Sequence, residues 1–315
     1  MATILDGKAL AEEALTELEG YVKSLKTLYN ITPGLAIIGF GETSGQVYVK
    51  NKKKTCKRLG IYCEHHEFDF TEGTDIKEDV ELLIDALNES DDIHGIIVQL
   101  PIPDEFDICP KCLIDKIKPE KDVDGLTTCN TRALWRDNCV GALHEPCTPA
   151  GIMTLLNRYY ISLEGKNVCI IGRSDLVGKP LAAMMMRENA TVTLCHSKTA
   201  REDIDYFIRA SDIVVCATGK PDMLDRVNCR GKIIIDVGIN RVDGKIVGDI
   251  SESVKSEFSK VYTPVPGGVG PMTVAMLMNN VINAAEYHQI SKLMDEAEDK
   301  DEDCYIFEKT FKRKY

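Results

Sequence analysis

The sequence predicts an α/β protein with two αβα domains and a substrate cleft between them. Short apolar runs of strand length alternate with amphipathic helical segments, glycine or proline directly follows several runs, and the alternation restarts near residue 147. Alternating strands and helices are typical of a parallel sheet that helices cover on both faces. With 315 residues and 44% hydrophobic content, the chain is long enough for two such domains.

The first half of the sequence is predicted to form three helices and three strands. Apolar side chains recur at helical spacing from Leu10 to Leu25, and Pro101 and Pro103 end the last strand. The predicted helices cover 7–28, 46–59 and 76–88, and the predicted strands cover 34–39, 62–68 and 95–99.

The second half predicts a further alternating unit. It begins with a helix at 148–159 and a strand at 166–171 that runs straight into Gly172. Further strands are predicted at 191–195, 213–217 and 232–237, and helices at 203–210 and 272–288. A polar, charged tail follows the last helix.

Net charge and hydropathy exclude several classes of protein. The net charge of −12 argues against general nucleic-acid binding, which requires a basic face. The sequence contains no apolar run of the roughly 20 residues that cross a bilayer. The N-terminus is acidic, unlike a secretory or mitochondrial leader. We therefore expect a cytoplasmic protein without membrane or nucleic-acid partners.

The twelve cysteines are scattered singly, and several, such as Cys169 and Cys216, lie inside apolar runs. We interpret them as reduced residues that mostly pack in the core. Cys109 and Cys112 form the one pair with CxxC spacing, but no second pair follows at the spacing of a zinc site. The sequence therefore predicts no metal, and we do not expect a redox site at this pair.

A glycine-containing turn, GRSDLVGKP at 172–180, follows a predicted strand and opens a helix. This context is the one that a phosphate-binding turn requires, with Gly172 permitting a tight turn and Gly178 a close backbone approach. The pattern favours a Rossmann-type dinucleotide-binding domain. The spacing is not GxGxxG, so an ordinary strand-to-helix turn is the alternative.

The next strand is followed by His196, Ser197 and Lys198 rather than by Asp or Glu. An acidic residue at this position binds the free ribose hydroxyls of NAD, whereas cationic groups such as Arg173 suit a 2′-phosphate. The sequence therefore predicts NADP rather than NAD. The alternative is that Lys198 lies on a solvated face.

Polar groups also gather beside glycine and proline loops in the first half. Tyr48 and Lys52 share one helix face, Gln99 ends a strand, and Asp124 precedes Gly125. The alternative for Tyr48 and Lys52 is a solvated basic helix face. The alternative for Gln99 is a strand-end amide with local hydrogen-bond partners, and that for Asp124 is a turn-forming carboxylate. The loop PVPGGVGP at 264–271 is either part of the same site or a plain helix-entry loop. Together these groups suit the polar edge of a heterocycle.

Six motifs, in order, resemble the methylenetetrahydrofolate dehydrogenase/cyclohydrolase family over residues 5–288: YVKNK, VQLPIP, DVDGL, PCTPAG, GRSDLVGKP and PVPGGVGPMT. The resemblance implies NADP-dependent oxidation of 5,10-methylenetetrahydrofolate to the 5,10-methenyl form, followed by hydrolysis to 10-formyltetrahydrofolate. It implies a homodimer and a folate domain at 1–146, to which about 286–315 return, beside an NADP-binding domain at 147–285. The alternatives are a monofunctional dehydrogenase and a non-catalytic nucleotide-binding regulator.

The resemblance also implies residue roles. Lys52 is the key catalytic group, Gln99 tunes it, Asp124 anchors the pterin ring, and Tyr48 stacks on or orients the substrate. Further substrate-binding residues are Ser44, Leu100, Pro266, Gly267 and Gly268. The implied cofactor-binding residues are Thr148, Gly172, Arg173, Ser174, Val177, Gly178, Ser197, Thr218, Gly219 and Ile239.

One expectation goes beyond the resemblance. Lys50, Lys53, Lys54 and Lys57 make a basic stretch within an acidic protein. Cellular folates carry a polyglutamate tail whose carboxylates need cationic partners, so we expect this stretch to attract that tail.

Overall fold

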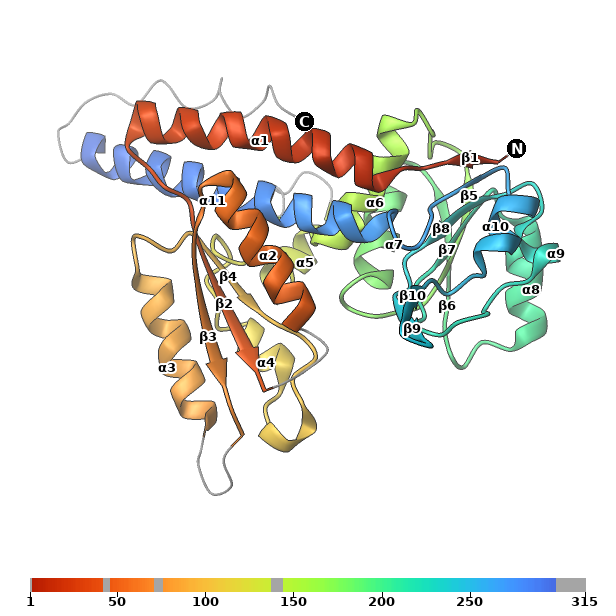
Figure 1. Cartoon of the computed structure of the whole chain (residues 1–315), viewed down its shortest axis with the longest axis horizontal. Coiled ribbons are helices and arrows are strands. Elements are labelled where there is room, and N and C mark those ends of the chain that lie inside the picture. The colour runs from red at the N-terminus through yellow and green to blue at the C-terminus, as the bar shows by residue number, and fades with distance from the viewer. Residues whose placement is uncertain (1, 42–45, 71–75, 137–143, 299–315) are drawn as a thin grey trace.

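Two units of helices and strands lie side by side in the computed structural model, which describes residues 2–41, 46–70, 76–136 and 144–298. Two long helices, α1 (Gly7–Tyr29) and α11 (Val269–Glu298), run next to each other along one side of both units (Figure 1). Among the described residues, none of the helices is both long and apolar enough to span a membrane.

The smaller unit contains a three-stranded parallel sheet in the order β3-β2-β4. Its strands are β2 (Gly34–Phe40), β3 (Tyr62–Phe68) and β4 (Gly95–Val98). The remaining elements of this unit are the helices α2 (Gln46–Leu59), α3 (Ile76–Glu89), α4 (Pro110–Ile114) and α5 (Thr128–Ala133) and the short 3-10 helix η1 (Asp104–Phe106).

Helices cover both faces of the smaller sheet because the central strand is apolar at every position. In β2, Leu35 and Ile37 belong to one core with residues of α1, α2 and α11, whereas Ala36 and Ile38 belong to another with residues of α3 and α4. Successive strand side chains point to opposite faces, so an unbroken apolar strand requires cover on both sides.

The larger unit contains a six-stranded parallel sheet in the order β1-β11-β8-β7-β5-β6. Its strands are β1 (Thr3–Ile4), β5 (Asn167–Ile171), β6 (Thr191–Cys195), β7 (Ile213–Cys216), β8 (Ile233–Asp236) and β11 (Val261–Tyr262). Its helices are α6 (Cys147–Arg158), α7 (Gly178–Arg187), α8 (Arg201–Ala210), α9 (Arg226–Cys229) and α10 (Glu252–Phe258), and a hairpin is formed by β9 (Asn240–Val242) and β10 (Lys245–Val247).

The larger sheet is also covered on both faces. Val168 and Ile170 of β5 pack with residues of α6, α7 and α11, and Cys169 and Ile171 pack on the opposite face with residues of α8. Each sheet therefore has an αβα arrangement, and the predicted fold class is confirmed.

Three features differ from the elements that the sequence predicts. The strand β1 extends the larger sheet by pairing with β11, although residues 1–146 are predicted to form the first domain. The last helix begins at Val269 and ends at Glu298, beyond the predicted 272–288. Within it, Leu277 to Ala284 already contribute to the core of the smaller unit, before the predicted return near residue 286.

Candidate active site

A pocket of about 320 Å³ lies between the two units. The smaller unit contributes polar groups, and the larger unit contributes a mostly apolar wall. The lining residues are Lys52, Val98, Gln99, Leu100, Asp124, Leu126, Cys147, Thr148, Leu176, Val177, Val237, Ile239, Val269, Gly270, Thr273, Val274 and Leu277.

Lys52 and Gln99 meet on the polar side of this pocket. Lys52 Nζ donates a hydrogen bond to Gln99 Oε1 at 3.1 Å, and Gln99 Nε2 donates one to the Leu100 carbonyl at 3.0 Å. Lys52 is half-buried, whereas its neighbours Lys53 and Lys54 are exposed. Lys52 is therefore less exposed than the lysines of a solvated helix face, and its hydrogen bond to the Gln99 side chain at the end of β4 sets its position.

Asp124 reaches the same pocket from a turn that another carboxylate holds in place. Asp122 accepts hydrogen bonds from the Thr127 amide at 2.7 Å and from Asn130 Nδ2 at 2.9 Å. Gly125 has a φ of 69°, and a side chain there would collide with the backbone of residues 144–146. Because Asp122 forms this turn, the carboxyl of Asp124 is left to face the pocket.

Burial raises the pKa of the Asp124 carboxyl, and the nearby positive charge of Lys52 opposes that shift. The nearby Cys147 thiol donates a hydrogen bond to the Val123 carbonyl at 3.3 Å, and burial raises the pKa of this thiol well above its usual range. Asp124 and Lys52 are therefore an opposite-charge pair in which Lys52 favours the ionised carboxylate.

Asn280 of α11 holds the turn from behind. Its Nδ2 donates to the Val123 carbonyl at 2.9 Å and to the Glu145 carbonyl at 3.1 Å. The Asn280 side chain is buried. Val123 directly precedes Asp124, and Glu145 lies just before the start of α6, so Asn280 ties these two segments together. Sequence reasoning did not identify Asn280, because its partners lie far away along the chain.

The turn after β5 requires both of its glycines. Gly172 has a φ of 127°, and a Cβ there would lie 2.2 Å from the Ala217 carbonyl oxygen. A Cβ on Gly178 would lie 1.9 Å from the Gly172 carbonyl oxygen. No side chain fits at either position, so the start of α7 is held directly against the end of β5.

The strand order places this turn at a switch point of the sheet. From β5 the chain passes to β6 on one side and then to β7 on the other. Ligands of open α/β sheets bind at the carboxyl ends of the strands where the order reverses in this way. The turn after β5 carries Gly172, and the turn after β7 carries Thr218 and Gly219.

The structure brings only some of the predicted cofactor residues into the pocket lining. Thr148, Val177 and Ile239 line it, and Thr148 Oγ1 lies 3.1 Å from Thr273 Oγ1. The others lie on the turns at the strand ends, outside that lining. Arg173, Ser174 and Ser197 are exposed there, and Ser174 Oγ accepts a hydrogen bond from the Val177 amide at 3.2 Å.

Pro266, Gly267 and Gly268 do not line this pocket, although they are predicted to bind substrate. The Gly267 carbonyl accepts a hydrogen bond from the Lys8 amide at 2.8 Å, and Gly268 packs against Gly7. The loop thus holds the start of α1, and the lining begins one residue later at Val269. Ser44 and the side chain of Tyr48 lie outside the described residues.

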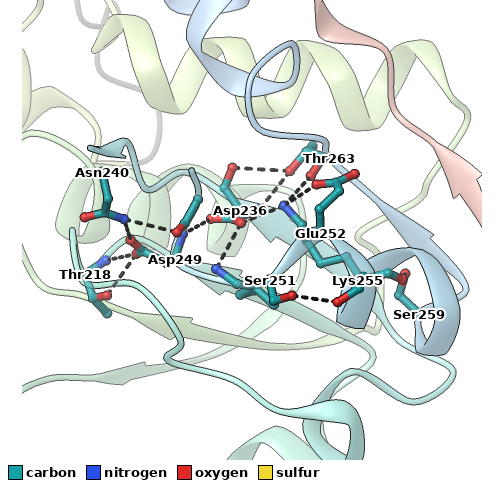
Figure 2. Close-up of polar contacts among 12 residues, drawn as sticks. Thr218, Asp236, Asn240, Asp249, Ser251, Glu252, Lys255, Ser259 and Thr263 are labelled. Atoms are coloured by element: carbon teal, nitrogen blue, oxygen red, sulfur yellow. Dashed lines mark hydrogen bonds and ion pairs between the residues drawn. The ribbon is translucent and has the colours of Figure 1, made fainter. Parts of the chain in front are cut away.

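A buried polar network supports the cofactor side of the pocket (Figure 2). The Asp249 Oδ2 atom accepts hydrogen bonds from the Thr218 amide at 2.6 Å and the Gly219 amide at 3.1 Å, and Oδ1 accepts one from Asn240 Nδ2 at 2.9 Å. Every one of these partners is a donor. The carboxylate therefore ties the turn after β7 to the segment after β8.

Asp236 and Lys255 continue this network into the core. Asp236 accepts from the Asp249 amide at 2.9 Å and from Lys255 Nζ at 2.7 Å, and both side chains are fully buried. Side chains at Gly238 or Gly248 would collide with these carboxylates. None of these residues was predicted, although DVGIN at 236–240 and GD at 248–249 pair glycine with aspartate.

Among the described residues, no three His, Cys, Asp or Glu side chains are grouped to hold a metal ion. The chemistry that the described pocket offers is proton transfer and hydrogen bonding by Lys52, Gln99 and Asp124. A dinucleotide would fit the glycine turns beside it.

We predict that Lys255→Met destabilises the protein by about 3–5 kcal/mol, because it leaves the Asp236 carboxylate buried without its cation. The loss should shrink toward low pH, since burial raises the pKa of Asp236 and the variant can fold with this group protonated. Urea unfolding at several pH values measures both effects. Lys260→Met, at an exposed lysine of the same region, is the matched control and should change stability little; an equal effect of both substitutions would contradict the prediction.

Two family models match the chain. The model described as the catalytic domain of tetrahydrofolate dehydrogenase/cyclohydrolase matches residues 5–124, and the model of the NAD(P)-binding domain of the same family matches residues 146–289. The first match covers Lys52, Gln99 and Asp124. The second covers the turns at the carboxyl ends of the larger sheet.

Two relatives are similar to this chain along nearly their whole length. The bifunctional protein FolD of Bacillus licheniformis is 43% identical over 293 residues, covering 90% of this chain and 98% of that protein. FolD of Moorella thermoacetica is 44% identical over 289 residues, covering 90% and 99%.

Two solved structures resemble this fold closely. The bifunctional dehydrogenase/cyclohydrolase FolD of Campylobacter jejuni has a TM-score of 0.84 and 41% identity, covering 91% of this chain and 99% of that one. The Trypanosoma brucei enzyme, complexed with NADP and an inhibitor, has a TM-score of 0.84 and 36% identity, covering 91% and 98%. The chain therefore belongs to the tetrahydrofolate dehydrogenase/cyclohydrolase family.

Proposed function

We propose that this protein is a bifunctional one-carbon folate enzyme. It oxidises 5,10-methylenetetrahydrofolate to 5,10-methenyltetrahydrofolate with NADP and then hydrolyses the product to 10-formyltetrahydrofolate. The observation that carries this proposal is the meeting of Lys52, Gln99 and Asp124 in one pocket whose opposite wall comes from the cofactor side. The family match and the relatives described as bifunctional support it.

On the substrate side, Asp124 binds the pterin ring. A pterin presents adjacent N–H donors that a carboxylate accepts in pairs, and a partly buried carboxylate makes such bonds stronger than a solvated one does. Leu100 and Leu277 provide apolar walls for the ring. Ser44 and Tyr48 are further substrate-binding residues in this proposal, and the loop at 266–268 supports the site through α1.

On the cofactor side, Gly172 and Gly178 allow the close approach that a pyrophosphate needs, and Arg173, Ser174 and Ser197 bind the phosphates. Thr148, Val177, Thr218, Gly219 and Ile239 hold the remainder. The glycine turn, where a Cβ at either glycine would meet backbone atoms, fits a dinucleotide. The 2′-phosphate is favoured because no carboxylate follows β6. When bound, NADP supplies the hydride acceptor for the oxidation.

Hydrolysis requires that the attacking water lose a proton as its oxygen bonds to the one-carbon bridge. Lys52 takes part in this proton transfer through its Nζ atom. The hydrogen bond from Nζ to Gln99 fixes the direction in which Nζ points, so that it faces the pocket rather than bulk water. Because both reactions change the same carbon, one pocket serves both steps.

We also propose a cytoplasmic homodimer that assembles through the NADP-binding domain, with domain boundaries near residues 146 and 285. Sedimentation of the purified protein tests the dimer.

Exposed lysines on α2 extend the site toward the tail of the substrate. Lys50, Lys53, Lys54 and Lys57 are exposed on the helix that carries Lys52. Polyglutamylated folates carry several carboxylates at the end remote from the pterin, so these lysines are suited to attract them.

We predict that Lys52→Met lowers the rate of hydrolysis by about 10²- to 10⁴-fold, the range typical of a lost proton-transfer group, and reduces cofactor reduction less. Absorbance assays with 5,10-methylenetetrahydrofolate and NADP, and then with the methenyl compound, measure the two steps. Lys54→Met, at an exposed lysine of the same helix, is the control. A wild-type protein that reduces cofactor without accelerating methenyl decay would be a monofunctional dehydrogenase, and inactivity in both assays would favour a regulator.

Arg173→Ala should raise KM for NADP by about 10- to 100-fold, because it removes hydrogen bonds between charged groups, while KM for NAD stays nearly unchanged. Initial rates with each cofactor measure the difference. Equal changes for both cofactors would remove Arg173 from the 2′-phosphate site.

Charge reversal of Lys53 and Lys57 to Glu should raise KM for a polyglutamylated substrate more than KM for the monoglutamate. The difference should shrink at high salt, because the lysines are exposed. The double reversal of Lys245 and Lys260 to Glu, at exposed lysines of the larger unit, controls for net charge. If both substrates respond equally to the double reversal, these lysines do not bind the tail.

A further inference from the structure

Two exposed cysteines face each other at the start of α4. Cys109 is the N-cap residue, Pro110 is the first residue of the helix, and Cys112 lies one turn along. The Cys112 S–H group donates to Cys109 Sγ at a sulfur-to-sulfur distance of 2.7 Å, and the Cys112 amide points at Cys109 Sγ from 3.4 Å. The CxxC spacing that suggested no site in the sequence thus brings two thiols into direct contact at the surface.

The surroundings make the two thiols unequal. The hydrogen bond from the Cys112 thiol, together with the Cys112 backbone N–H and the charge of Lys77, lowers the pKa of Cys109. The same hydrogen bond raises the pKa of Cys112. Since the thiolate is the nucleophile, Cys109 is the sulfur that attacks first and Cys112 the one that follows.

Access and proximity occur together at this pair. Cys169 and Cys195 have sulfurs 3.9 Å apart, but both are buried between the sheet and its helices. Cys129 is exposed on α5 but does not share the CxxC spacing. A small disulfide in solution can therefore reach Cys109, and the second thiol is already within reach of the mixed disulfide that would form.

We propose that Cys109 and Cys112 are a surface dithiol that exchanges with low-molecular-weight disulfides such as glutathione disulfide. The Cys109 thiolate attacks one sulfur of the disulfide, forming a mixed disulfide and releasing one glutathione thiolate. Cys112 then loses its proton and attacks Cys109 Sγ, which breaks the mixed disulfide and releases the second glutathione. Two protein thiols are oxidised to one disulfide, and one small disulfide is reduced to two thiols.

This site is separate from the folate pocket. Neither cysteine lines that pocket, and the side chains of α4 that pack inward are Leu113 and Ile114, in the core of the smaller sheet. Closing the bond brings the two sulfurs together over a short distance and requires no movement of Leu113 or Ile114. We therefore expect the folate activities to be similar in the reduced and oxidised forms.

The test is to incubate the reduced full-length protein with glutathione disulfide, trap the remaining thiols by alkylation and map the cysteines by mass spectrometry. The wild type should lose two hydrogens within residues 109–112 and carry no glutathione there. Cys112→Ser should accumulate a glutathione adduct on Cys109, because the second thiol is missing. Cys109→Ser should form no disulfide within residues 109–112, and any glutathione that attaches to Cys112 should remain there, because the partner thiol is missing.

Cys129→Ser is the matched control at a single exposed cysteine and should form the 109–112 disulfide at the wild-type rate. A wild-type protein that keeps glutathione on Cys109 without closing the internal bond would overturn the proposal. So would reaction of Cys129 as fast as Cys109. Because the readout is a change in mass, it is independent of the folate activity.

Discussion

The packing of α11 into two cores is the constraint on which the site depends. Met272 and Ala275 belong to the core of the larger sheet, and Leu277 and Met278 belong to the core of the smaller one. Because protein interiors are close-packed, a helix buried in both cores fixes the distance and angle between the two sheets. The pocket lies along this same helix, between Val269 and Leu277. The packing of this helix therefore sets the spacing of the two sheets on either side of the pocket.

The helix α11 also holds the polar groups on the substrate side of the pocket in place. Asn280, less than one turn beyond Leu277, binds the carbonyls of Val123 and Glu145 and so positions the turn that presents Asp124. The helix that carries Lys52 contacts α11 through the sulfur atoms of Cys56 and Met278, 3.6 Å apart. The cofactor side is held differently, by the buried carboxylate of Asp249 binding backbone amides. Two independent supports thus converge on one pocket.

The elements that the sequence predicted share a local cause. The strand β2 follows from an unbroken apolar run, and the helix α2 from helical spacing after a glycine-containing segment. Gln99 and Asp124 stand at the end of a strand and in a turn, and Lys52 shares a helix face with Tyr48, all of which can be read from the sequence. The strands β1 and β11 were missed because two residues carry no periodicity, and they pair across the length of the chain. Asn280 and Asp249 were missed for a related reason, since their roles depend on backbone groups that only the fold brings near them.

The opposite charges in the pocket also bear on how one site performs two reactions. Before substrate enters, the positive charge of Lys52 offsets part of the cost of burying the Asp124 carboxylate. In the proposed complex, the pterin N–H donors that bind this carboxylate would take over part of this compensation. Oxidation places a positive charge on the one-carbon bridge, which opens that carbon to attack by water. The role proposed for Lys52, proton transfer with this water, is therefore needed only after the first reaction has taken place.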